Sequence, residues 1–224
     1  MKLLAQVLSY IFHPLLMPVI GLICIFFLPT FPRTLYIFDS LYFFPDEIKS
    51  KLFWVFGVLL FLAPLVSVLI MYWNKMISSL HLEKREERGY PFFIVTFYYL
   101  LTYIFFRYQW PEELRHPALV SLLFGLVITG IVVMLINRYS KISVHAVASF
   151  GLAGLLLAYN QNQMSFYEEV SFPNIPVILL AIILAGIISS ARIYLKSHTL
   201  SEILLGMIVG FGTMYACVKW ELSL

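Results

Sequence analysis

The chain has 224 residues, of which 61% are hydrophobic and only 12% are charged. An average soluble domain carries about 25% charged residues, so this composition excludes an ordinary soluble fold and makes the lipid bilayer the expected environment. The net charge of +3 is too small to indicate a nucleic-acid partner.

Seven apolar segments are long enough to cross a bilayer, and short polar links separate them. In chain order, the expected spans are Leu3–Leu28, Leu52–Trp73, Pro91–Phe106, Pro117–Ile136, Ile142–Tyr159, Ile175–Ser190 and Thr199–Val218. Pro14 and Pro18 predict a kink in the first span, which membrane helices tolerate when neighbouring groups satisfy the freed carbonyls. The sequence therefore predicts an all-α, polytopic transmembrane helical bundle of about seven spans, forming one membrane domain over residues 1–224.

Three polar clusters follow the second, fourth and sixth expected spans. The first runs from His81 to Arg88 and includes Lys84 and Arg85; the second comprises Lys141, Ser143 and His145; the third comprises Arg192, Lys196, His198 and Glu202. Because an even number of spans separates each pair of clusters, all three are expected on the same face of the membrane. This shared face is the strongest indication in the sequence that the clusters form one site.

The residue types in these clusters suit a phosphate ligand. Several cations at one point bind phosphate oxygens, and guanidinium groups do so bidentately. A helix that starts near Ser143 adds its positive N-terminal end, and histidine can attack phosphorus or transfer protons near neutral pH. His198 and Glu202 are four residues apart, so on one helix face the carboxylate would fix the tautomer of the imidazole.

The third cluster also resembles a known signature. Ala191-Arg192, followed after five residues by His198 and after three more by Glu202, resembles the Ser-Arg-x5-His-x3-Asp signature of the type 2 phosphatidic acid phosphatase superfamily. These are membrane lipid phosphate phosphatases related in fold to vanadium haloperoxidases. The segment 142–145, Ile-Ser-Val-His, is similar to the Pro-Ser-Gly-His motif of that family, and the first cluster looks like a loose version of its Lys-x6-Arg-Pro motif.

The resemblance implies a role for each matching residue. His198 would be the nucleophile that forms a phosphohistidine, Glu202 would orient it, and His145 would be the general acid. The groups expected to bind the phosphoryl oxygens are Arg192, Ser143 and Arg88, with Lys84, Arg85 and Lys141 as further phosphate-binding candidates. The resemblance also implies a six-helix phosphatase core over residues 52–224, with residues 1–51 as an additional N-terminal span and loop. No metal and no other cofactor are expected, because the cations take the place of a metal.

Several positions depart from the family pattern. Ala191 stands in place of a serine, Glu202 in place of an aspartate, and Val144 in place of a glycine. Arg88 is followed by Gly89, and the lysine position of the first motif holds His81. These departures keep a second hypothesis open beside lipid phosphate hydrolysis, namely a catalytically inactive protein of the same fold that binds a lipid phosphate or serves as a subunit of a membrane complex.

The sequence also bears on substrate and location. Phosphatidic acid, polyprenyl diphosphate and other lipid phosphates all remain open as substrates, and the sequence indicates no particular protein partner. The expected location is the bacterial inner membrane, with the site facing outward. Lysine and arginine are more numerous on the face of the three clusters, but that excess disappears when Lys84, Arg85, Arg88 and Arg192 are set aside as functional groups.

Overall fold

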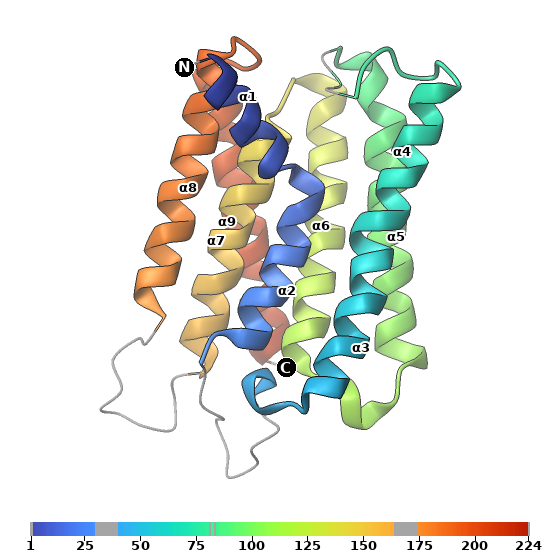
Figure 1. The fold of residues 1–224 in the computed structure, drawn as a ribbon, viewed down its shortest axis with the longest axis vertical. Coiled ribbons are helices and arrows are strands. Elements are labelled where there is room, and N and C mark those ends of the chain that lie inside the picture. Colours follow the sequence, from blue (N-terminus) through green and yellow to red (C-terminus); the bar gives the residue numbers. More distant parts are fainter. Residues whose placement is uncertain (1, 30–39, 81, 83, 164–173, 224) are drawn as a thin grey trace.

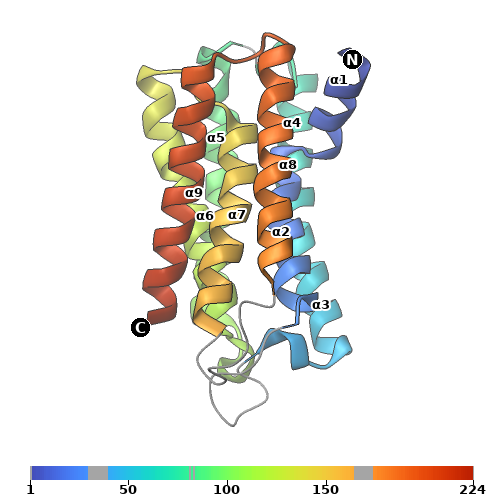
Figure 2. The ribbon, with the colours of Figure 1, turned by 90° about the vertical axis from the view of Figure 1, so that its left-hand side faces the viewer.

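The computed structural model describes residues 2–29, 40–80, 82, 84–163 and 174–223, and within them the chain is helical with no strand. The helices form one bundle with their axes roughly parallel (Figures 1 and 2). The α-helices are α1 (Lys2–Ile11), α2 (Met17–Phe27), α3 (Asp46–Gly57), α4 (Ala63–Trp73), α5 (Gly89–Ile104), α6 (Pro117–Tyr139), α7 (Val144–Gln163), α8 (Ile175–Tyr194) and α9 (Leu200–Ser223). Shorter helical turns are η1 (Pro14–Leu16), η3 (Leu41–Phe43), η4 (Val58–Leu62), η5 (Glu86–Arg88), η6 (Phe105–Gln109) and η7 (Glu112–Leu114).

Six of the described helical segments are long and apolar enough to cross a membrane. They are Lys2–Phe27, Asp46–Trp73, Glu86–Gln109, Pro117–Tyr139, Ile175–Tyr194 and Leu200–Leu222. The first two are composite: α1, η1 and α2 form one, and α3, η4 and α4 form the other. The predicted all-α polytopic bundle is confirmed, and the chain is an integral membrane protein.

Helix α7 overlaps the predicted fifth span, Ile142–Tyr159, but continues to Gln163 and is not among these six segments. It is the central helix of the bundle. None of its residues from 144 to 161 is exposed, because α9, α8 and α2 pack around it. Its contact with α9 depends on small residues: a Cβ on Gly210 would lie 2.0 Å from the carbonyl oxygen of Val147, and one on Gly206 would lie 2.8 Å from that of Ser143. This close approach joins the start of α9 to the start of α7.

The N-terminal span is kinked as the two prolines predicted. Pro14 disfavours the helical conformation for the residue before it, and His13 is extended, with φ −62° and ψ 139°. On either side of this break the span contacts different helices, since α1 packs against α8 while α2 packs against α7 and α3. Because of the kink, the N-terminal span crosses the end of α7 that lies at the same end of the bundle as the N-terminus (Figure 1).

Helix ends differ from those expected from apolarity alone. The loop predicted to reach Lys51 is wrong, because α3 already begins at Asp46, where two acidic residues favour the first turn of a helix. The sixth and last spans were also predicted too short: α8 continues to Tyr194 and α9 to Ser223. Helical hydrogen bonding continues past the last apolar residue, so Arg192 belongs to the last turn of α8 and not to a link.

Candidate active site

The links that carry the three polar clusters lie at one end of the bundle, together with the N-terminus (Figure 1). They connect α4 to α5, α6 to α7, and α8 to α9. The structure therefore brings the clusters to the same end, as the number of intervening spans predicted. His81 and Glu83 of the first cluster lie outside the described residues.

His198 and Glu202 form a close pair at the start of α9. The Nδ1 atom of His198 lies 2.5 Å from Oε2 of Glu202, and the side chain of the histidine is 2% exposed. Because a carboxylate accepts hydrogen bonds, Nδ1 carries the proton and Nε2 retains its lone pair. The pair thus has the arrangement in which an acidic residue orients a histidine for chemistry at the other nitrogen.

The pKa of His198 favours the neutral imidazole. Burial lowers this pKa from 6.5 to about 4; the hydrogen bond to Glu202 acts in the opposite direction, while the positive charges of Arg88 and Lys141 lower it further. An imidazole must be unprotonated to attack an electrophile. At neutral pH, His198 therefore holds the protonation state that a nucleophile requires.

Two arginines of the predicted set are buried beside this pair. Arg88 is 3% exposed and Arg192 is 7% exposed. Arg88 donates from Nε to the carbonyl of Leu82, at 2.7 Å, and from Nη1 to the carbonyl of Ile142, at 3.0 Å. The guanidinium of Arg88 thereby ties the first cluster to the segment that leads into α7.

Lys141 and Ser143 hold the links in place. The Nζ atom of Lys141 donates to the carbonyl of Ser197, at 3.0 Å, and so joins the α6–α7 link to the residue before His198. Ser143 is fully buried, and its Oγ accepts from the backbone N–H of Ala146, at 3.4 Å. This is the hydrogen bond of a helix N-cap, which satisfies a donor in the first turn of α7.

The two remaining predicted cations point elsewhere. The side chain of Lys84 is 66% exposed, and its Nζ lies 3.3 Å from a carboxylate oxygen of Glu87. Arg85 donates from Nη1 to the carbonyl of Tyr139, at 2.9 Å, at the end of α6. Neither side chain is among the described residues that line the cavity at this end of the bundle.

His145 contacts the N-terminal span, which the sequence did not indicate. Its Nε2 lies 3.2 Å from the carbonyl oxygen of Ser9, and its ring meets the ring of His13 edge-on, with centroids 6.2 Å apart. Neither His13 nor Ser9 is among the candidate site residues predicted from the sequence. The kink predicted from Pro14 and Pro18 was the available signal, because it makes the span cross the head of α7.

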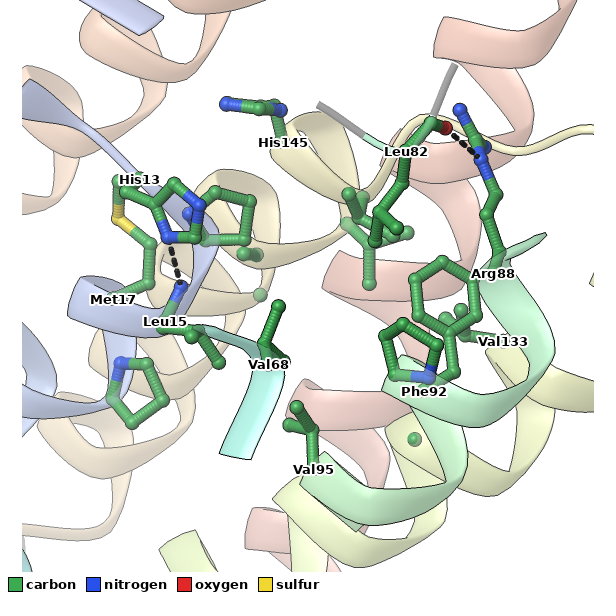
Figure 3. Close-up of a pocket in the computed structure, with 18 of the residues that line it drawn as sticks. His13, Leu15, Met17, Val68, Leu82, Arg88, Phe92, Val95, Val133 and His145 are labelled. Carbon is green, nitrogen blue, oxygen red and sulfur yellow. Dashed lines mark hydrogen bonds between the residues drawn. The ribbon is translucent and has the colours of Figure 1, made fainter. Parts of the chain in front are cut away.

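A cavity of about 570 Å³ connects these groups with the apolar interior. Its polar end is lined by Arg88, His145, Arg192 and His198, and its walls below are mostly aliphatic and aromatic side chains of α4, α5, α6 and α7. Figure 3 shows His13 and His145 on the left, Arg88 on the right, and Val68 and Val95 below them. A cationic end joined to an apolar cavity suits an amphiphile with an anionic head group.

Comparison with known proteins supports the family resemblance. The sequence matches the profile of the PAP2 superfamily over residues 91–223. The match includes the second and third polar clusters and begins three residues after Arg88, so the first cluster and the N-terminal span lie outside it. No curated protein and no solved structure matches the chain.

Proposed function

The chain belongs to the PAP2 superfamily, and we propose that it hydrolyses a lipid phosphomonoester or pyrophosphate, without a metal ion, through a phosphohistidine on His198. Membership of this superfamily indicates phosphatase activity on phosphate esters. The finer proposal is supported by one observation above all. The imidazole of His198, which Glu202 orients, lines the same cavity as the buried guanidinium groups of Arg88 and Arg192.

The proposed reaction has two steps. In the first, the Nε2 lone pair of His198 attacks phosphorus, the bond from phosphorus to the leaving oxygen breaks, and His145 gives a proton to that oxygen. In the second, water attacks the phosphohistidine, His145 takes a proton from the water, and the electron pair of the P–N bond returns to His198. Arg88 and Arg192 would stabilise the charge on the equatorial oxygens in both transition states, a role usually worth several kcal/mol.

The apolar part of the cavity supports a lipid as the substrate. Leucine and valine side chains such as Leu65, Val68 and Leu126 line it, so that a hydrocarbon chain attached to the phosphate would remain out of water. A phosphatidic acid and a polyprenyl diphosphate share this chemistry. The rates on the two would tell which head group the cationic end prefers.

The direct test is phosphate release by the purified protein in detergent, with a metal chelator present. We expect release from at least one lipid phosphate, and its loss in His198→Ala. His116→Asn is the matched control, because His116 is a buried histidine that caps α6 at the other end of the bundle and asparagine can replace that cap. Undiminished release by His198→Ala would exclude the phosphohistidine mechanism.

A binding protein without turnover is the second candidate, and Val144 favours it. Its side chain lines the cavity at the position where the resembling motif has glycine, and there it reduces the room for a phosphate against the backbone. Saturable binding of a lipid phosphate without release of phosphate would establish this alternative. Turnover abolished by the single change His198→Ala would exclude it.

We further propose that the cavity end of the bundle faces outward from the bacterial inner membrane. Tyr139 is 79% exposed at this end, and the side chain of Glu112 is 88% exposed at the other. In a chain without Cys24 and Cys217, an impermeant maleimide should label Tyr139→Cys in spheroplasts and Glu112→Cys only after permeabilisation. The reverse pattern would place the site in the cytoplasm.

A further inference from the structure

The candidate general acid is held by a backbone group of the N-terminal span. Helix α1 ends at Ile11, so the carbonyl of Ser9 is one of the last four carbonyls, which an α-helix leaves without an intrahelical partner. Pro14 ends the helical path at this point, because it favours the extended conformation that His13 adopts. The carbonyl of Ser9 is thereby presented to Nε2 of His145, at 3.2 Å.

This contact determines which nitrogen of His145 can exchange a proton. A carbonyl oxygen only accepts hydrogen bonds, so Nε2 must carry a proton. The other nitrogen, Nδ1, is buried and has no hydrogen-bond partner among the described residues. Nδ1 is therefore the atom that can gain and lose a proton while Nε2 stays bound to Ser9.

The neighbouring histidine makes the arrangement rigid. The Nδ1 atom of His13 accepts a hydrogen bond from the backbone N–H of Leu15, at 3.3 Å, and so caps η1. This bond fixes the ring of His13, which packs edge-on against His145 at an interplanar angle of 75°. A ring held at Nε2 and packed on one side keeps few orientations, and this reduces the reorganisation that proton transfer needs.

We propose that the N-terminal span, which lies outside the region matching the PAP2 superfamily, positions His145 for catalysis through the Ser9 carbonyl. The inference rests on the proposed function. Once Nδ1 has taken up a proton, it gives that proton to the leaving oxygen as the bond from phosphorus to oxygen breaks. Nδ1 then takes a proton from the water that cleaves the P–N bond. The proton on Nε2 remains with the Ser9 carbonyl throughout, and Ser9 and Pro14 are positioning residues.

The experiment removes the kink with Pro14→Ala, which lets the helix continue so that its own N–H groups take up the carbonyl of Ser9. Two substrates are compared: a lipid alkyl phosphate, whose leaving oxygen needs a proton, and p-nitrophenyl phosphate, whose leaving group needs none. General acid catalysis contributes about 10² to 10⁴ in rate. We therefore expect the alkyl rate to fall about 100-fold or more relative to the aryl rate.

The ratio of the two rates is measured on one protein sample, so partial unfolding of the variant cancels. Pro64→Ala is the matched control, because it removes a buried proline from the second candidate span and should leave the ratio unchanged. In a His145→Ala background, Pro14→Ala should change the ratio no further, because both substitutions disrupt the same proton transfer, the one made by His145. An additive effect, or an unchanged ratio in Pro14→Ala alone, would overturn the proposal.

A structural measurement separates this inference from the proposed function. Nitrogen-15 NMR of histidine-labelled protein, with signals assigned by His145→Ala, should show a protonated Nε2 on His145 whether or not the protein turns over a substrate. Absence of phosphate release with this signature present would refute only the enzymatic function. An Nε2 without a proton would refute the positioning role even in an active enzyme.

Discussion

His198 and His145 are each held at one ring nitrogen, but the two holding groups differ in kind and in distance along the chain. A carboxylate four residues away on α9 holds His198, and a backbone carbonyl 136 residues away on α1 holds His145. The first pair belongs wholly to the region that matches the superfamily, whereas the second joins that region to the additional span. A site that is local in space can therefore depend on a segment outside the recognisable family sequence.

The largest expected effect comes from the pair on α9. Glu202→Gln keeps the size of the side chain but removes the charge that orients and stabilises the imidazole of His198. We expect kcat to fall by as much as about 10⁴, the loss seen when a triad acid becomes its amide. The alkyl and aryl substrates should lose rate equally, because both need the same nucleophile. A loss of less than tenfold would mean that Glu202 has no such role.

The next effect compares a buried arginine with an exposed one at the same end of the bundle. Arg192→Ala removes a cation from the cavity, and we expect kcat/KM to fall about 10² to 10³-fold, as for loss of one transition-state donor. Arg138 is in the last turn of α6 but exposed, so Arg138→Ala should stay within about twofold. Equal losses in both variants would indicate a general electrostatic effect without a bound phosphoryl group.

A smaller effect is expected on stability. Gly210→Ala would press a methyl group against the carbonyl of Val147, and overpacking of this kind costs about 1–3 kcal/mol. The midpoint of thermal unfolding in detergent should fall, and activity should fall with it, because the same contact joins the starts of α7 and α9. Gly212→Ala is the control, since nothing lies within 4 Å of its added Cβ. A Gly210→Ala variant as stable as this control would contradict the packing described for α7.

The smallest expected effect is a displacement along the pH axis. Burial lowers the pKa of His198 to about 4, so the nucleophile remains neutral well below pH 6.5. The acidic limb of the pH profile of kcat/KM, where the rate falls because His198 becomes protonated, should therefore lie below pH 6.5, toward pH 4. Because Glu202 raises this pKa, Glu202→Gln should move the limb further toward acid in its residual activity. An acid limb at or above pH 6.5 would show that His198 is not buried as the structure describes.

The difference between a local contact, as at His198, and a long-range one, as at His145, explains how much of the molecule could be predicted from its sequence. Hydropathy predicted the spans, and counting them predicted that the three polar clusters share one end. The spacing of His198 and Glu202 predicted their pairing, because residues four apart on a helix meet. These successes share one property: the relevant geometry is local or periodic.

The remaining features depend on geometry that the order of residues does not reveal. Nothing in the composition of the first cluster tells which cations point inward, so Lys84 and Arg85 could not be separated from the buried Arg88. The partner of His145 is a main-chain carbonyl, and every residue carries one. Prolines predicted the kink that exposes the Ser9 carbonyl, but only the packed structure shows which side chain meets it.

The proposed function depends above all on a covalent bond between His198 and phosphorus. The most direct measurement mixes the protein with a lipid labelled with ³²P in the scissile phosphoryl group, quenches the reaction in alkali within a turnover, and locates the label by mass spectrometry. We expect phosphohistidine at His198 in the parent protein and no label in His198→Ala. Phosphate released with a label on another residue, or with no labelled protein at any time in the turnover, would contradict it.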